Sequence, residues 1–252
     1  MNGRISIDRV LARLDEYLHK NDYAAAERHL LYWLAEAEQC SDAQAFLLTR
    51  NELMGLYRKL GKREQALECV SAALDKIEQL DIGHQVGAAT TFLNCATVYK
   101  AFGMAEQSLP LFERARDIYD KELAEDDARL GGLYNNMALS LVDVGRFDEA
   151  DELYRKAIDV MRRSEDGAPE IAITYLNMAS AAEARYGGVE ADEMIGQYLQ
   201  KARELLETYS KRDGYYAFVC EKCATVFGYY GHFVYCEELE QRARRIYENE
   251  GT

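Results

Sequence analysis

Asparagine side chains recur at matching places along the chain. Asn94 and Asn136 lie 42 residues apart, Asn177 lies 41 residues beyond Asn136, and Asn51 and Asn135 fall one place earlier in their own segments. A side-chain amide offers both a donor and an acceptor, so an array of amides can bind an extended peptide backbone without reading its side chains. Asparagine is a mediocre helix former, which makes its recurrence within helical patterns notable. The pattern predicts a peptide-holding surface; the alternative is that these amides bond neighbouring helices or face water.

A second set of residues has the ligand types of a structural zinc site. Cys220, Cys223, His232 and Cys236 follow the spacing C-x2-C-x8-H-x3-C, and four nitrogen or sulfur ligands suit zinc. The three cysteines also fall on the expected buried faces of helices, where free cysteine behaves as a small hydrophobe. A redox C-x-x-C would need a helix start after a strand, and no strand is expected. Core packing is therefore predicted, with no metal or cofactor, and zinc is the minor alternative.

Catalytic motifs are absent from the sequence. The segment GLYRKLGK at 55–62 resembles a phosphate loop, but five residues separate its glycines, no Ser or Thr follows, and the segment lies on a helical pattern. The four histidines, His19, His29, His84 and His232, stand in unrelated contexts. There is no G-x-S-x-G, H-E-x-x-H or dinucleotide fingerprint. The chain is predicted not to be an enzyme.

The elements that carry these residues are helical hairpins. In the segment 133–158, Tyr134, Met137, Ala138 and Leu141 form one helix face, Gly145 ends that helix, and a second amphipathic pattern follows. Turn glycines recur 42 residues apart, with a last interval of 44, at Gly61, Gly103, Gly145, Gly187 and Gly231. One hairpin cannot bury its own apolar face, and a fixed period in this range indicates stacked repeats.

The repeated residues resemble a known family. The segments 95–116 and 137–158 share a small-x3-aromatic pattern or a close variant of it before the glycine, and an alanine-aromatic-alanine pattern after it. This is similar to the tetratricopeptide repeat (TPR), and the period, longer than the usual ~34 residues, resembles that of kinesin light chain-like TPR proteins. The resemblance implies an all-α fold, a right-handed α-α superhelix of about six helical hairpins. We expect a single solenoid over 1–252, with units at about 5–40, 43–80, 84–123, 126–164, 168–209 and 214–249.

In TPR proteins the first helix of each hairpin lines a concave groove, so the resemblance places the asparagines there. The expected peptide-binding residues are Asn51, Asn94, Asn135, Asn136, Asn177, Arg58, Thr97, Lys100, Ser180, Phe218, Lys222 and Thr225. The basic clamp that recognises chaperone C-termini is not expected. Val142 and Glu183 stand where Arg58 and Lys100 lie in earlier units.

Composition limits the partners. A net charge of −14 argues against nucleic acid as a partner. The acidic residues indicate either a solvated exterior or a preference for neutral or basic partners. No apolar run approaches the ~18 residues of a membrane span, the start shows no signal-peptide pattern, and six scattered cysteines form no disulfide framework. We expect a cytoplasmic protein with no membrane partner.

Three local features carry further expectations. Pro110 lies inside a helical pattern, which predicts a kink or break, and Trp33 is expected in the core or cap. The tyrosines of the last unit, Tyr215, Tyr216, Tyr229, Tyr230 and Tyr235, either close the end of the solenoid or form a surface for a partner or a second copy.

The predicted function is a binding module for an extended peptide or protein tail of unknown identity. One alternative is a structural scaffold or homo-oligomerising adaptor that uses the Tyr/Cys-rich last unit, which would include a homodimer. The remaining alternative is a receptor for a small peptide signal.

Overall fold

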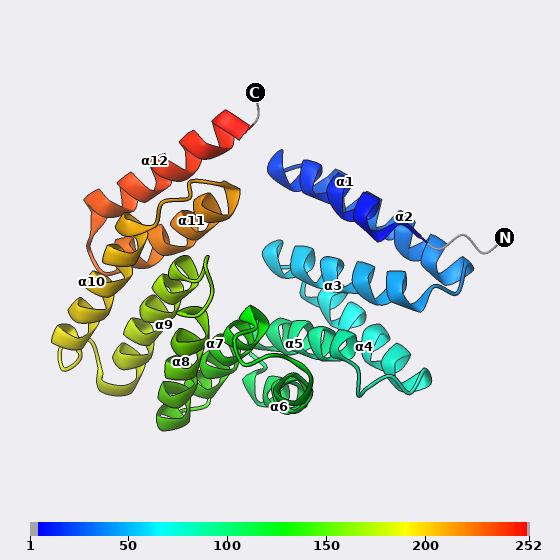
Figure 1. Ribbon diagram of the computed structural model, residues 1–252, viewed down its shortest axis with the longest axis horizontal. Coiled ribbons are helices and arrows are strands. Elements are labelled where there is room, and N and C mark those ends of the chain that lie inside the picture. Colours follow the sequence, from blue (N-terminus) through cyan, green and yellow to red (C-terminus); the bar gives the residue numbers. More distant parts are fainter. Residues whose placement is uncertain (1–4, 251–252) are drawn as a thin grey trace. The chain divides into compact units, whose positions relative to one another are not determined.

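The structure is a computed structural model that describes residues 5–250, with the side chains of 249–250 excepted. These residues form twelve α-helices and no strand, so the all-α prediction is confirmed (Figure 1). The helices are α1 (Ile7–His19), α2 (Tyr23–Gln39), α3 (Ala43–Lys59), α4 (Arg63–Gln79), α5 (Val86–Ala101), α6 (Ala105–Glu122), α7 (Ala128–Asp143), α8 (Phe147–Met161), α9 (Ala168–Tyr186), α10 (Asp192–Thr208), α11 (Gly214–Tyr229) and α12 (Phe233–Glu250).

The helices divide into two compact units. Unit 1, Met1–Glu122, contains the hairpins α1–α2, α3–α4 and α5–α6, and unit 2, Leu123–Thr252, contains α7–α8, α9–α10 and α11–α12. The single solenoid over 1–252 stays a prediction, and its residues 1–4 and 251–252 lie outside those described.

The periodic glycines end the first helices of the hairpins, as the sequence predicts. Gly61, Gly103, Gly145 and Gly231 have φ values of 67°, 75°, 77° and 81°, a left-handed conformation that glycine adopts without a steric penalty. Each lies in a three-residue link between two helices. The backbone turns sharply there and the second helix folds back on the first.

The fifth hairpin departs from this pattern. The link from α9 to α10 spans 187–191, longer than the others, as the sequence predicts. Gly187 has φ 87° and ψ 157°, a region open essentially to glycine alone. Pro169 lies in the first turn of α9, where its fixed φ and missing N–H are tolerated.

The sequence predicts a kink or a break at Pro110. The break is wrong, because α6 runs without interruption through that residue, and the kink stays a prediction. Pro110 is the sixth residue of α6 and its side chain is exposed. Because proline has no N–H, the backbone carbonyl one turn before Pro110 loses its helical hydrogen bond. That carbonyl lies near the start of α6, where water can bond it.

Small residues let the helices approach within each unit. Ala73, Ala115 and Ala157 lie 42 residues apart on the second helices, and all three are 0% exposed. Ala96 and Ala138 keep the same spacing on first helices and are also fully buried. The repeat therefore keeps an alanine at these fully buried positions of successive hairpins, where a small side chain allows close packing.

A buried hydroxyl on α8 supports a stability prediction. Tyr154 is 0% exposed and its hydroxyl has no hydrogen-bond partner among the described residues, so burial raises its pKa. Phe112 occupies the same repeat position 42 residues earlier. We expect Tyr154→Phe to raise the free energy of unfolding by about 1 kcal/mol, because it removes an unpaired buried polar group. Thermal denaturation would measure the change.

The matched control is Tyr119→Phe on α6. The Tyr119 hydroxyl is bonded to the Thr90 hydroxyl at 2.7 Å, so this variant should lose about 1 kcal/mol. Equal destabilisation by the two variants would show that the Tyr154 hydroxyl is bonded after all.

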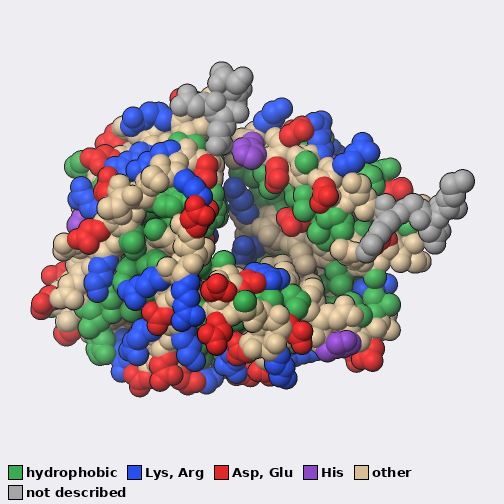
Figure 2. Space-filling model, viewed as in Figure 1, with side chains coloured by type: hydrophobic (Ala, Val, Ile, Leu, Met, Phe, Trp, Pro, Cys, Tyr) green, Lys and Arg blue, Asp and Glu red, His purple; other side chains and the backbone are tan. Residues whose placement is uncertain are grey.

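Charged side chains of both signs are mixed over the visible faces of both units (Figure 2). Most ion pairs are exposed, such as Arg146–Glu149 at 2.6 Å, and contribute little to stability. Unit 2 is the more acidic part, with 25 of the 44 acidic residues and 15 of the 30 basic ones.

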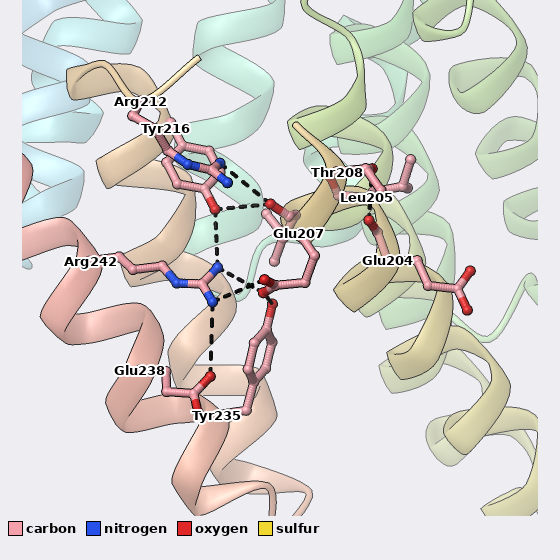
Figure 3. A network of polar contacts seen from close by, with 10 residues as sticks. Glu204, Leu205, Glu207, Thr208, Arg212, Tyr216, Tyr235, Glu238 and Arg242 are labelled. Carbon is pink, nitrogen blue, oxygen red and sulfur yellow. Dashed lines mark hydrogen bonds and ion pairs between the residues drawn. The ribbon is translucent and has the colours of Figure 1, made fainter. Parts of the chain in front are cut away.

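The tyrosines of the last hairpin bind the hairpin before it. The hydroxyls of Tyr229 and Tyr230 donate to Glu183 at 3.1 and 2.9 Å. The hydroxyl of Tyr215 donates to Glu170. Tyr216 and Tyr235 are buried, and their hydroxyls donate to the Leu206 carbonyl and to Glu207. These tyrosines therefore join α11 and α12 to α9 and α10, and Figure 3 shows the α10 contacts of Tyr216 and Tyr235. The second copy considered for this surface stays a prediction.

Candidate functional site

The candidate site is a cavity of about 650 Å³ within unit 2. Three first helices supply most of its wall: α7 and α9 are in contact, and so are α9 and α11. The other lining residues come from the end of α8 and the α8–α9 link. Together the lining residues are Ala128, Arg129, Gly132, Asn135, Asn136, Leu139, Met161, Ser164, Asp166, Glu170, Ile173, Leu176, Asn177, Tyr215, Lys222, Cys223 and Val226.

The asparagines supply the amide groups of this wall. Asn177 Nδ2 donates to Asn135 Oδ1 at 3.1 Å, which links the middles of α7 and α9. Asn136 Nδ2 donates to the Gly132 carbonyl at 2.8 Å, one turn back on its own helix. Asn135 Nδ2 and the carbonyl oxygens of Asn136 and Asn177 have no partner among the residues described. The cavity thus presents one amide donor and two amide acceptors available to a ligand.

Apolar side chains form a second part of the wall. Leu139, Ile173, Leu176 and Val226 line the cavity, and Met161 closes it where its side chain lies against Gly131. Cys223 is 0% exposed in the core between α11 and its neighbours, and burial raises its pKa, which keeps the thiol protonated. A concave, mostly apolar surface with a few convergent polar groups is typical of a ligand site.

Two of the charged lining residues are held by ion pairs. Arg129 donates to both oxygens of Asp127, at 2.9 and 2.6 Å, and this bonding lowers the pKa of Asp127. Asp166 pairs with Lys211 at 2.5 Å and accepts from the Tyr209 hydroxyl at 3.0 Å. The Lys211 bond is the main cause that lowers the pKa of Asp166.

The other two charged lining residues each contact an aromatic side chain. Glu170 accepts from the Tyr215 hydroxyl, and the pKa of Tyr215 is raised by burial and by that carboxylate. The Lys222 ammonium lies 4.6 Å from the centre of the Phe218 ring, a cation–π contact.

Four of the predicted groove residues line the cavity, namely Asn135, Asn136, Asn177 and Lys222. Ser180 and Thr225 lie on the same helices outside it, and their hydroxyls donate to carbonyls four residues back. Phe218, 41% exposed, serves as the platform for Lys222.

The remaining predicted groove residues belong to unit 1. Asn51 Nδ2 donates to the Thr91 hydroxyl at 3.1 Å, joining α3 to α5, and Asn51 Oδ1 is buried without a partner. Asn94 is half-buried with no hydrogen bond to the described residues, and Thr97 donates to the Leu93 carbonyl. The last two predicted groove residues are cationic. Arg58 is exposed, and Lys100 is half-buried.

Sequence reasoning missed much of the wall. Gly132 and Leu139 precede and follow Asn136 on one helix face, as Ile173 precedes Asn177. Extending the asparagine register by one helical turn in each direction would have found them. Arg129, Met161 and Asp166 lie at helix ends and in the α8–α9 link, where the repeat gives no signal.

The proposed zinc ligands are not gathered into a site. Cys220 and Cys223 are fully buried in the core of unit 2, while His232 is exposed in the α11–α12 link. Across residues 5–250 no group of three or more His, Cys, Asp or Glu side chains is placed to hold a metal. Burial also raises the pKa of Cys95, to about 12, so that this thiol is not an activated nucleophile.

The sequence model described as tetratricopeptide repeat matches residues 44–121 and 129–187. The chain belongs to the tetratricopeptide repeat family. The matched residues include the hairpins that carry Asn51, Asn94, Asn136 and Asn177. The cavity lies on the first helices of the last two of these hairpins, α7 and α9, and on α11. The TPR fold supports a protein–protein interaction module.

Two named relatives are kinesin light chain-related proteins. KINESIN LIGHT CHAIN-RELATED 2 of Arabidopsis thaliana is 24% identical over 199 residues, 78% of this chain and 28% of the relative. KINESIN LIGHT CHAIN-RELATED 3 of the same plant is 24% identical over 157 residues, 62% and 23% of the two chains. The TPR chain therefore spans about a quarter of the length of these relatives.

Solved structures agree on the fold. BtubC (BKLC) from P. vanneervenii matches with a TM-score of 0.55 at 20% identity, covering 92% of both chains. A kinesin light chain-type protein of Podosopora anserina with nearly identical TPR-like repeats matches with a TM-score of 0.52 at 20% identity, covering 79% of this chain and 94% of that one. The TPR solenoid fold and the resemblance to kinesin light chain-like repeats are confirmed. Over the described part of the chain, none of the TPR helices is both long and apolar enough to cross a bilayer.

Proposed function

We propose that this TPR protein is a non-enzymatic interaction module that binds an extended peptide or protein tail on the first helices of unit 2. One observation carries the proposal: the cavity wall presents an amide donor and two amide acceptors, from Asn135, Asn136 and Asn177, that no described residue satisfies. An extended backbone offers matching carbonyl and N–H groups along its length. Unsatisfied polar groups in a concavity favour a ligand that pairs with them.

A structural scaffold is the second candidate function. It is favoured by two interhelical bonds, Asn51 to Thr91 and Asn177 to Asn135, because these amides also hold neighbouring first helices together. In a scaffold the asparagines would stabilise the repeat and the cavity would stay without a peptide. The two functions predict different results for a variant that lacks the cavity amides and still folds. Such a variant loses its partner if the cavity binds a peptide, and keeps its partner if the protein is a scaffold.

The test is capture of partners from lysate by the wild type and by the double variant Asn136→Ala with Asn177→Ala, followed by direct binding of the captured partner's segment. We expect affinity to fall by about tenfold or more, since each lost hydrogen bond contributes roughly 1 kcal/mol. Circular dichroism would establish that the variant is folded. The matched control removes two amides from α10, Gln197→Ala with Gln200→Ala, which bond only Glu193 and Glu204 on the same helix.

Equal binding of the same segment by the wild type and the folded asparagine variant would contradict the peptide-binding function and favour the scaffold. Loss of binding in the α10 variant as well would place the interaction elsewhere on unit 2.

A further inference from the structure

The most exposed apolar side chains of the described residues gather at two links of unit 2. Val189 lies in the α9–α10 link, Tyr229 ends α11, and Phe233 and Val234 begin α12. These four side chains, which we call the link patch, are between 70% and 87% exposed, more than any other large hydrophobic residue that the structure describes. Single exposed apolar residues are ordinary, whereas a group of them marks an interaction surface.

One carboxylate brings the two links together. Glu183, near the end of α9, accepts the Tyr229 hydroxyl at 3.1 Å through its Oε1 atom. The same oxygen lies 3.6 Å from the place of a β-carbon built at Gly188, the residue before Val189. Only the short α11–α12 link separates Tyr229 from Phe233. The link patch is therefore one region of the surface.

A hollow of about 170 Å³ opens at the start of α12. Its lining includes Phe233, Val234 and Glu238, together with Arg203 of α10. The Arg203 guanidinium lies 4.4 Å from the centre of the Tyr235 ring, so this cation already has a contact on α12. The hollow shares no lining residue with the cavity on the first helices, and it offers a place for one side chain of a partner.

The surroundings of the link patch are acidic. The segments 183–193 and 229–240 contain one arginine and seven carboxylates, namely Arg185 against Glu183, Glu190, Asp192, Glu193, Glu237, Glu238 and Glu240. Arg185 is paired with Asp148 and Asp151, at 2.7 and 3.5 Å. Glu183 meets the patch at Tyr229, and Glu238 lines the hollow. The patch is thus an apolar surface with a negatively charged rim.

This combination discriminates among the occupants of such a surface. A second copy of the chain would bring two acidic rims against each other, and an anionic bilayer would meet the same repulsion. A protein surface with apolar residues between lysines and arginines buries its apolar side chains on the patch and pairs its charges with the rim. The exposed rings of Tyr229 and Phe233 attract cations as well.

We propose that the link patch docks a protein partner whose contact surface is apolar at its centre and basic at its edge. The inference goes beyond the proposed function and does not depend on it, because the patch lies at the links of the last two hairpins and not in the cavity on the first helices. Since the rim contacts are between exposed charges, docking weakens as salt rises.

The test uses a library of phage-displayed random peptides, selected in parallel on the full wild-type chain and on the full Asn136→Ala with Asn177→Ala variant. Peptides that bind both equally are kept, since they do not need the cavity amides. We expect them to combine aromatic or aliphatic residues with an excess of Lys and Arg over Asp and Glu. Their affinity for the wild type should fall about threefold or more between about 0.15 M and 0.5 M salt.

The double variant Phe233→Ser with Val234→Ser should bind the kept peptides about tenfold more weakly or worse. Thermal denaturation checks that it is folded. Val189→Ser, on the other link, should weaken them about threefold or more, and this single variant decides the question if the double variant fails to fold. The matched control, Leu31→Ser with Tyr32→Ser on α2, removes two exposed apolar side chains of unit 1 and should change the affinity less than about twofold.

A second pair of variants tests the acidic rim. Glu190 lies in the α9–α10 link, and Glu237 lies one turn after Phe233 on the same face of α12. Glu190→Lys with Glu237→Lys should weaken the kept peptides about tenfold or more. Glu78→Lys with Glu113→Lys makes an equal change in net charge at exposed positions of α4 and α6, and should weaken them less than about twofold.

Several results would overturn the inference while leaving the proposed function standing. They are the absence of any peptide that binds both chains, kept peptides with an excess of Asp and Glu, and equal binding by the wild type and a folded patch variant. Binding to phosphatidylserine vesicles that is lost in the patch variant would assign the patch to a lipid surface instead. Dimerisation in sedimentation equilibrium that is lost in the same variant would assign it to a second copy.

Discussion

Gly167→Ala is expected to lower the free energy of unfolding by about 3 kcal/mol or more, since overpacking against fixed backbone has no inexpensive relaxation. Gly167 caps α9, immediately after the link from α8. A methyl group added there would lie 1.8 Å from the Met161 carbonyl oxygen and 2.7 Å from its carbonyl carbon. That oxygen already accepts the Ser164 N–H at 3.1 Å, so the end of α8 and the start of α9 must separate. Chemical denaturation would measure the loss.

The control for this prediction is Gly188→Ala in the next link. The nearest atom to a methyl group at Gly188 is the Glu183 carboxylate at 3.6 Å, an ordinary contact, so the change should stay within about 0.5 kcal/mol. Similar stability of the two variants would show that the close approach at Gly167 relaxes freely.

Glu207→Ala is expected to lower the free energy of unfolding by about 2 kcal/mol. Glu207 on α10 accepts from both Arg242 nitrogens, at 2.7 and 3.1 Å, and from the Tyr235 hydroxyl at 2.7 Å (Figure 3). Loss of this carboxylate leaves the hydroxyl of Tyr235, which is 3% exposed, without a partner. It also removes the ion pair between Arg242 on α12 and α10. Glu204→Ala, one turn earlier, should change little because Glu204 bonds only exposed groups of its own helix.

The Glu207 contribution also depends on pH. The hydrogen bond from Arg242 is the main cause that lowers the pKa of Glu207 from its ordinary 4.5. A carboxyl group with a depressed folded-state pKa stabilises the fold fully above its unfolded value, and the effect disappears as pH falls through the folded value. The free energies of unfolding of the wild type and Glu207→Gln should therefore differ most at neutral pH. The difference should shrink as the pH falls below 4.5 and through the depressed folded-state pKa of Glu207. A difference that stays constant down to pH 3 would contradict the ion pair.

Much of the fold could be predicted because its signals are local. The turn glycines act within a few residues, and the structure places them where the pattern indicates. Pro110 was misjudged for the same reason: the cost of a proline depends on its distance from the helix start and on solvent access, which the local pattern does not give.

The candidate site was predictable only in part. Asn136 and Asn177 were found by their spacing, because equivalent helix positions face the same way in successive hairpins. The contact of Asn177 with Asn135 depends on the stagger between α7 and α9, and the pairing of Asp166 with Lys211 joins residues 45 apart. Neither has a local signal.

The sequence by itself determined the helical hairpins, their boundaries and their repetition, since helix periodicity and turn conformation are properties of short segments. Only the tertiary structure decided which amides pair with each other, which carboxylates the tyrosines of the last hairpin bind, and where a cavity remains. Those outcomes follow from how closely successive hairpins stack, and the stacking distance is set by the combined volumes of side chains from several helices at once.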